Sequence, residues 1–212
     1  MTSQSESLCL YHFPLSGHAH RARLFLSLLG LDTRIVDIDL LKGEQKTPDF
    51  LSKNPFGQVP VLEDGEVTLA DSNAILVYLA LRYDPARRWY PVDDPVAAAR
   101  VQRWLSVAAG ELHAGPASAR VAVLFKRPDS LEPMHAKAQR LFSLLDAHLA
   151  DHEFLAAEHP TIADIAIYTY TSHAPEGGIP LDPYPNVRAW LTRLEALPGF
   201  VSMKRVDVAK AG

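Results

Sequence analysis

The sequence has few of the features that mark secreted, membrane or nucleic-acid-binding proteins. It has a single cysteine, Cys9, which excludes an internal disulfide and fits a reducing compartment. No apolar run approaches the ~18 residues of a membrane-spanning helix. The polar start at residues 1–6 lacks the basic and then apolar order of a signal peptide. The 21 basic and 25 acidic residues are mixed along the chain, so no basic face favours nucleic acid. We therefore expect a cytoplasmic protein that binds neither nucleic acid nor membrane.

Two further absences argue against particular kinds of active site. No C-x-x-C motif is present, which disfavours a dithiol oxidoreductase. The nine histidines include His18 and His20 close together, but no pattern places three on one face with a carboxylate, so no metal site is expected. The hydrophobic content of 48% in 212 residues is ordinary for a globular protein of one large or two small domains.

The first 84 residues alternate between strand and helix signals. A helix is expected over 19–29, where apolar residues recur three and four apart before Gly30 ends it. The other expected elements are strands over 8–13, 34–40, 59–62 and 66–69, a short helix opened by Thr47-Pro48, and a helix over 72–83. The order β-α-β-α-β-β-α predicts a mixed sheet covered by helices.

Strand signals stop after a proline-rich stretch, 85–94, which we interpret as an interdomain linker. The expected helices beyond it cover 96–112, 132–149, 161–173 and 186–197, giving an all-α second domain over 95–212. Gly110 and Gly115-Pro116 should kink or break the first of these helices. Thr161 and Asp164 are expected to form a capping box at the start of the third.

The most informative stretch runs from Asn54 to Ile75. A proline within an apparent strand cannot donate to a sheet, so Pro60 belongs at an edge or a special turn and is a candidate cis peptide. The backbone groups of Val59 are then free to pair with an extended ligand. Asp71 and Ser72 open the following helix, where free N–H groups and the helix dipole favour a carboxylate. The pattern predicts a site for a short, acidic, peptide-like ligand.

The segments Gln58-Val59-Pro60 and Asp71-Ser72-Asn73-Ala74-Ile75 are together similar to the glutathione-binding signature of glutathione transferases. The resemblance extends upstream to 13–17 with Arg21 and to 42–51, and downstream to 160–166. It implies a thioredoxin-like N-terminal domain over 1–84 and an all-helical C-terminal domain. It is close to the bacterial, soluble members whose active-site hydroxyl belongs to a serine.

On this resemblance Ser16 is the catalytic residue. A thiolate forms more easily when it accepts a hydrogen bond at a helix N-terminus, and Ser16 stands just before the first helix. The alternative is that Ser16 only caps that helix. Tyr11 is a rival hydroxyl, but aligning Phe13-Pro14 with the tyrosine-type members puts His12 at the tyrosine position. Adjacent strand residues face opposite sides, so Tyr11 should point away from the sulfur.

The resemblance also implies the residues that hold glutathione. Gln45 and Lys46 would bind the glycine carboxylate, and Asp71 and Ser72 the γ-glutamyl end. Gln58, Val59 and Pro60 would also bind glutathione, and the backbone of Val59 would pair with the cysteinyl unit. The family often has glutamate where this chain has Asp71. Arg21 either neutralises ligand charge or is a surface residue.

The function implied is conjugation of the glutathione thiolate to a small apolar electrophile, the chemistry of a detoxification enzyme. Glutathione is a co-substrate, no other cofactor is implied, and the resemblance implies a homodimer to which Phe56 could contribute. Two alternatives stay open: a non-catalytic glutathione-binding or regulatory module, and a glutathione-dependent peroxidase or reductase on the same site. Residues that line an electrophile pocket, or alternatively belong to the helical core, are Trp104, Glu111, His113, Tyr168 and Tyr170.

Overall fold

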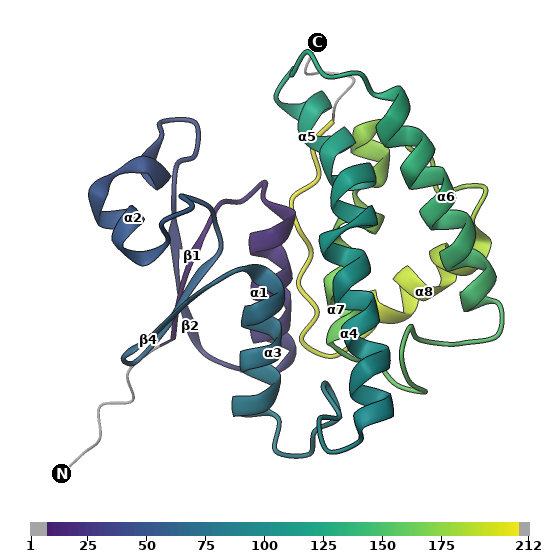
Figure 1. Ribbon diagram of the computed structural model, residues 1–212, viewed down its shortest axis with the longest axis horizontal. Coiled ribbons are helices and arrows are strands. Elements are labelled where there is room, and N and C mark those ends of the chain that lie inside the picture. Colours follow the sequence, from purple (N-terminus) through teal and green to yellow (C-terminus); the bar gives the residue numbers. More distant parts are fainter. Residues whose placement is uncertain (1–7, 208–212) are drawn as a thin grey trace. The chain divides into compact units, whose positions relative to one another are not determined.

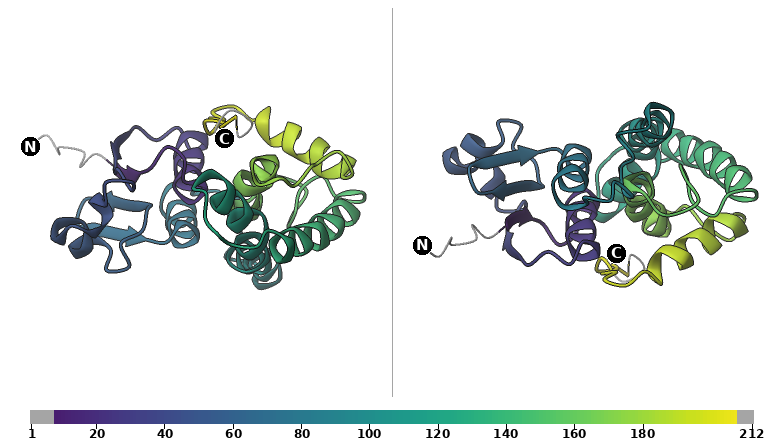
Figure 2. Two further views of the ribbon diagram at one scale, coloured as in Figure 1. Left: turned by 90° about the horizontal axis from the view of Figure 1, so that it is seen from above. Right: turned by 90° about the horizontal axis from the view of Figure 1, so that it is seen from below.

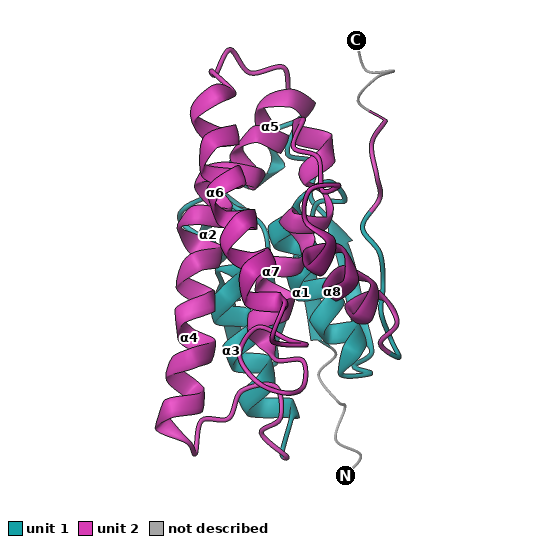
Figure 3. Cartoon of the chain, turned by 90° about the vertical axis from the view of Figure 1, so that its right-hand side faces the viewer, with its two compact units in different colours: residues 1–85, 198–203 teal, residues 86–197, 204–212 magenta. Residues whose placement is uncertain are grey.

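The structure, a computed structural model, describes residues 8–207. The polar residues 1–6, on which the expectation about a signal peptide rests, lie outside the described residues. The chain divides into two compact units, one of residues 1–85 with 198–203 and one of 86–197 with 204–212 (Figure 3). Among the helices of residues 8–207, none combines the length and the apolar character needed to cross a membrane.

Unit 1 contains a four-stranded sheet and three α-helices. Its elements are β1 (Leu8–His12), α1 (Gly17–Leu28), β2 (Thr33–Asp37), η1 (Glu44–Lys46), α2 (Pro48–Lys53), β3 (Val61–Asp64), β4 (Val67–Ala70) and α3 (Ser72–Tyr83). The strand order is β2-β1-β3-β4, with β2 parallel to β1 and the hairpin β3–β4 antiparallel. Helices α1 and α3 cover one face of this sheet and α2 lies on the other (Figures 1 and 2). The predicted order β-α-β-α-β-β-α is confirmed.

The helices of unit 1 begin where the sequence predicted caps. Thr47 accepts a hydrogen bond from the N–H of Phe50 at 3.4 Å, with Pro48 in the first turn of α2. Asp71 accepts hydrogen bonds from the N–H groups of Asn73 and Ala74, both at 2.9 Å, at the start of α3. These local bonds explain why the start of α3 matches the prediction.

Two strands differ from their expected bounds, β2 in length and β3 in position. The strand expected over 34–40 is β2, which pairs with β1 only from Thr33 to Asp37. The strand expected over 59–62 is β3, whose pairing with β1 and β4 starts at Val61. Pro60 precedes the strand rather than lying in it, because a residue without an N–H cannot take part in an interior ladder.

Unit 2 is helical. Its elements are α4 (Pro95–Ala109), η2 (His113–Ala117), α5 (Ser118–Leu124), α6 (Glu132–Leu149), α7 (Ile162–Ser172), η3 (Ala174–Gly177) and α8 (Pro185–Glu195). All eleven residues of α7 are buried, and this helix packs against α4 and α8 (Figure 1). The helix predicted over 132–149 is confirmed.

The helix expected over 96–112 differs in the structure. It ends as α4 at Ala109, and after Gly110 the chain continues through the wide π-helical turn η2 into α5, which the sequence did not predict. Pro116 lies within this turn. It has no N–H to donate and its ring crowds the preceding turn, so a wider turn lets the helix continue where a break was expected.

The predicted capping box at the start of α7 is confirmed. The carboxylate of Asp164 accepts hydrogen bonds from the N–H and the hydroxyl of Thr161, at 2.9 and 3.2 Å. It also accepts from the backbone N–H of Leu155 at 2.9 Å and from the indole N–H of Trp190 at 3.0 Å. One buried carboxylate therefore joins the start of α7 to a loop and to α8.

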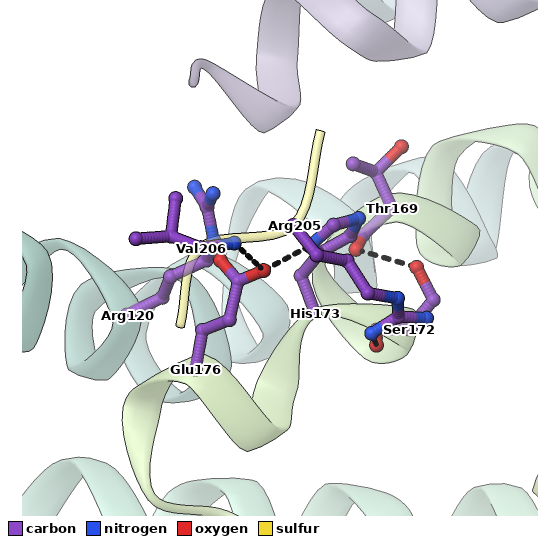
Figure 4. Close-up of polar contacts among 7 residues, drawn as sticks. All are labelled: Arg120, Thr169, Ser172, His173, Glu176, Arg205 and Val206. Carbon is purple, nitrogen blue, oxygen red and sulfur yellow. Dashed lines mark hydrogen bonds and ion pairs between the residues drawn. The ribbon is translucent and has the colours of Figure 1, made fainter. Parts of the chain in front are cut away.

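A second buried carboxylate, that of Glu176, joins three other parts of unit 2 (Figure 4). Its Oε2 accepts from Nε of Arg120 at 2.7 Å. Its Oε1 lies 2.8 Å from Nδ1 of His173 and accepts from the backbone N–H of Val206 at 3.1 Å. Burial alone would raise the pKa of Glu176, but the hydrogen bond from His173 and the charge of Arg120 lower it to about 2.

The C-terminal segment is shared between the units. Residues 198–203 belong to unit 1, where the carbonyl of Gly199 accepts from the hydroxyl of Ser27 at 2.7 Å. The carbonyl of Val201 lies 2.9 Å from Nε2 of His20. Both contacts fasten the segment along α1.

Candidate functional site

Three segments that carry predicted site residues meet at one end of the unit 1 sheet. In the antiparallel pairings, Val61 lies opposite both Tyr11 and Ala70. The carboxyl end of β1, the amino end of β3 and the carboxyl end of β4 therefore lie at the same end of the sheet. Ser16 follows β1, Val59 precedes β3 and Asp71 follows β4, so all three residues belong to segments at this end of the sheet.

Ser16 is the N-cap of α1. Its Oγ accepts a hydrogen bond from the N–H of Ala19 at 3.2 Å, and its side chain is half-buried. Within residues 8–207 this hydroxyl makes no other hydrogen bond, so its proton can be donated to a ligand. Capping the helix and donating to a thiolate are therefore compatible in one side chain.

The side chains of Tyr11 and His12 form hydrogen bonds with carboxylates of neighbouring strands. The Tyr11 hydroxyl donates to Oε2 of Glu63 at 2.9 Å, and burial together with this carboxylate raises the pKa of the phenol. His12 is buried with its Nδ1 3.0 Å from Oδ1 of Asp37, and burial lowers its pKa. Neither side chain offers the hydroxyl that a thiolate at the start of α1 requires.

The peptide bond between Val59 and Pro60 is cis, as the sequence suggested. Neither the N–H nor the C=O of Val59 is hydrogen-bonded to any described residue. The preceding loop is held by Asn54, whose amide donates to the carbonyl of Gln58 at 2.7 Å. Val59 therefore presents two free backbone groups from an anchored loop, while the Gln58 side chain is exposed.

Gln45 and Lys46, in η1, lie against the same loop. A Cβ on Gly57 would come within 2.8 Å of the carbonyl oxygen of Gln45 and of Nζ of Lys46, so only glycine fits there. Nζ of Lys46 is 3.5 Å from the carbonyl oxygen of Phe56. The amide of Gln45 donates to the carbonyl of Leu40 at 3.4 Å. Its Oε1 is buried, with no hydrogen-bond partner among residues 8–207.

Asp71 has a carboxylate oxygen to spare. Oδ1 accepts both cap hydrogen bonds of α3, whereas Oδ2 has no partner among the described residues and the side chain is exposed. The backbone of Asp71 has φ of 72°, in the left-handed region that a residue with a Cβ rarely adopts. Strained backbone of this kind is concentrated at functional sites.

Ser72 differs from the prediction in its surroundings. Its hydroxyl, which was expected to bind the γ-glutamyl end, is buried and accepts a hydrogen bond from Arg21 at 2.8 Å. The same guanidinium nitrogen donates to Oδ1 of Asn73 at 2.9 Å. Arg21 is therefore no surface residue. Helical spacing left a surface position equally open for Arg21, and its contacts with Ser72 and Asn73 decide between the two alternatives.

Three of the five residues predicted for an electrophile pocket or the helical core, Trp104, Tyr168 and Tyr170, are core residues of unit 2. Trp104 is buried and its indole N–H donates to the carbonyl of Leu155 at 2.8 Å. Tyr168 is buried and its hydroxyl donates to Glu195 at 2.9 Å. Glu111 and His113 are exposed, so a role in the pocket stays a prediction for them.

The thiol and metal chemistry of the chain is limited. Cys9 is buried in β1, and burial raises the pKa of its thiol, so it is a poor nucleophile. In the part of the chain that the structure describes, no group of three histidine, cysteine or acidic side chains is arranged to hold a metal ion.

Comparison with known proteins places these features in a family. Residues 6–81 match the family model of the glutathione S-transferase N-terminal domain, and residues 120–198 that of the C-terminal domain. Glutathione S-transferase 3 of Zea mays is 35% identical over 204 residues, which cover 91% of each chain.

Solved structures agree with these matches. A possible glutathione S-transferase from Rhodopseudomonas palustris is 36% identical, with a TM-score of 0.84 over 94% of this chain and 90% of that one. A glutathione S-transferase from Pseudomonas fluorescens is 33% identical, with a TM-score of 0.86 over 92% and 98%. The predicted fold, a thioredoxin-like domain followed by a helical one, is confirmed. The chain belongs to the glutathione S-transferase family of enzymes.

Proposed function

We propose that the protein conjugates the thiolate of glutathione to a small apolar electrophile. The observation that carries the proposal is the convergence of three elements at one end of the unit 1 sheet. These are the free hydroxyl proton of Ser16, the free backbone groups of Val59 and the free carboxylate oxygen of Asp71. Each matches a different part of one tripeptide.

The tripeptide would lie across this end of the sheet. Val59 pairs with the cysteinyl unit as an added strand would, next to Pro60 and Gln58. Oδ2 of Asp71 takes the γ-glutamyl ammonium, and Ser72 with its N–H takes the α-carboxylate. At the other end, Gln45 and Lys46 donate to the glycine carboxylate.

Ser16 then stabilises the reacting sulfur. A free thiol has a pKa near ~8.5, and lowering it by about two units requires roughly 2.7 kcal/mol of preferential stabilisation of the thiolate. One charge-assisted hydrogen bond from Ser16, together with the dipole of α1, is of that size. The proton leaves to solvent and the sulfur lone pair forms the new S–C bond. A leaving group departs with its bonding pair, or an addition product takes up a proton.

The sole cysteine supports conjugation over disulfide exchange. Cys9 is buried in β1 with a raised pKa, so the protein offers no accessible thiol for a mixed disulfide. We propose that glutathione supplies the only reacting sulfur and that no other cofactor takes part.

The test measures Ser16→Ala with glutathione and 1-chloro-2,4-dinitrobenzene. Because the hydroxyl matters mainly to the ionised sulfur, turnover should fall about 10-fold to 100-fold while glutathione affinity changes little. Tyr11→Phe is the matched control and should keep full turnover. Glutathione binding without turnover on any electrophile, or loss of activity in Tyr11→Phe with Ser16→Ala unaffected, would contradict the proposal. Cumene hydroperoxide and a disulfide substrate, assayed in parallel, distinguish peroxidase and reductase activity.

We also propose that the enzyme is a cytoplasmic homodimer. Phe56 is 78% exposed, in the loop between α2 and β3, and an exposed aromatic side chain is suited to insert into a partner. Phe56→Ser should lower the molar mass measured by light scattering from twice that of the chain towards the 23.4 kDa of one chain. Equal masses for the two proteins would contradict the role of Phe56.

A further inference from the structure

The feature that the proposed mechanism leaves unused is the buried cation of Arg21. The side chain is 1% exposed, on the second turn of α1. Its NH1 donates to Oγ of Ser72 at 2.8 Å and to Oδ1 of Asn73 at 2.9 Å, both in the first turn of α3. Nδ1 of His18 lies 3.4 Å from the same nitrogen. One guanidinium therefore joins the beginnings of two helices.

These two helices carry two anchors of the proposed glutathione site. The N-cap of α1 is Ser16, which faces the sulfur, and the N-cap of α3 is Asp71, which faces the γ-glutamyl ammonium. Arg21 fixes the first turn of α3 against α1. The separation of the two anchors is therefore set through this side chain.

Arg21 also determines what the Ser72 hydroxyl can do. Since the oxygen accepts from a cation, its own proton must point to another acceptor. The neighbour on the protein is Nδ1 of His18 at 3.3 Å, which is long for a hydrogen bond from a hydroxyl. A hydroxyl polarised by a charged donor is itself a stronger donor, and a buried positive charge favours an anion nearby.

We propose that Arg21 is a positioning residue for substrate recognition, which makes the Ser72 hydroxyl a directed and strengthened donor to the α-carboxylate of glutathione. The guanidinium does not touch the ligand and acts through Ser72. This inference rests on the proposed glutathione site and adds to it the residue that sets the specificity for the γ-glutamyl end.

The test compares two ligands that differ in one group. Glutathione and 4-aminobutyryl-cysteinylglycine, which is glutathione without its α-carboxylate, are titrated by calorimetry. In Arg21→Gln, glutathione should bind about tenfold more weakly, the low end for loss of a hydrogen bond to a charged group. The analogue should change less than twofold. Arg21→Lys, which keeps the charge, should recover part of the loss.

The matched control is Arg23→Gln, which removes the same charge from an exposed position on the same helix. It should leave both affinities within twofold of the unsubstituted protein. Equal weakening of both ligands in Arg21→Gln would show a merely structural role and overturn the inference, as would unchanged glutathione binding. If the unsubstituted protein binds neither ligand, the proposed function itself fails, which is a distinct result.

A second variant keeps the test decisive if Arg21→Gln loses its fold, which circular dichroism detects. The effect of Arg21→Lys on glutathione affinity is then measured with and without Ser72→Ala. The effect should vanish when the hydroxyl is absent, because Arg21 acts through it. If Arg21→Lys still changes the affinity for glutathione when Ser72→Ala is also present, the inference is overturned.

Discussion

Replacing Glu176 by glutamine removes the one negative charge shared by the cluster of Arg120, His173 and Val206. The carboxylate is 5% exposed and is contacted by these three partners at 2.7, 2.8 and 3.1 Å. An amide keeps one oxygen but turns an N–H₂ group towards a donor. The variant therefore loses hydrogen bonds and leaves the buried guanidinium of Arg120 without this counter-charge.

The size of the effect follows from the pKa of Glu176. The environment lowers it from an ordinary value of 4.5 to about 2. At about 1.36 kcal/mol per pKa unit, the charged form contributes on the order of 3 kcal/mol to the free energy of unfolding at neutral pH. Breaking a buried ion pair by removing one partner costs roughly 3–5 kcal/mol, which agrees.

The sign of the pH dependence is fixed by the lowered pKa. The contribution is fully present above the unfolded pKa of Glu176, near 4.5, and is lost as the pH falls through 4.5 towards about 2. At pH 3 it should have shrunk to roughly 1.5 kcal/mol. A protonated glutamate resembles glutamine, so Glu176→Gln and the unsubstituted protein should converge in stability at low pH.

The assay is urea unfolding followed by tryptophan fluorescence at pH 7 and pH 3. The three tryptophans, Trp89, Trp104 and Trp190, all belong to unit 2 and report on the unit that contains the cluster. Glu158→Gln, an exposed position in the same unit, is the control and should change the free energy of unfolding by less than ~0.5 kcal/mol. A difference below ~1 kcal/mol for Glu176→Gln at pH 7, or one that does not shrink at pH 3, would refute the reasoning.

Two further predictions concern single carboxylates. Asp71→Asn keeps the cap oxygen and the side-chain shape but not the charge, so glutathione should bind about tenfold more weakly in a titration. Cysteinylglycine should bind with equal affinity to Asp71→Asn and to the unsubstituted protein. An equal loss of affinity for cysteinylglycine would show that Asp71 is only a helix cap. Asp164→Ala leaves the buried donors of Thr161, Leu155 and Trp190 unpaired, which should lower the free energy of unfolding by about 3 kcal/mol in urea. A loss under ~1 kcal/mol would mean that water replaces the carboxylate.

Local signals explain what the sequence predicted well. The start of α3 follows from the cap at Asp71, and the start of α7 from the Thr161–Asp164 box, because a cap and its helix are neighbours in sequence. The cis peptide before Pro60 was likewise expected from one residue in an unusual place. In each case the determining contact lies within a few residues.

What the sequence did not predict depends on long-range packing. The partner of Arg21 is Ser72, 51 residues away, so the pattern around Arg21 could not distinguish a surface arginine from a buried one. Around Pro116 the sequence predicted a kink or break rather than a wide turn. The packing that lets α5 follow this turn depends on residues elsewhere in the chain. Trp104 and Tyr168 were assigned to a pocket or a core, and only their partners Leu155 and Glu195 decide between the two.

The position of residues 198–203 limits how unit 1 can be expressed alone or exchanged with that of a relative. Residues 198–203 run along α1, where Gly199 and Val201 accept from Ser27 and His20. A gene fragment that stops at residue 85 encodes the sheet and its helices but not this strip of chain. An exchange of the thioredoxin-like module of this chain therefore has to transfer two separate pieces of sequence, the residues up to 85 and residues 198–203.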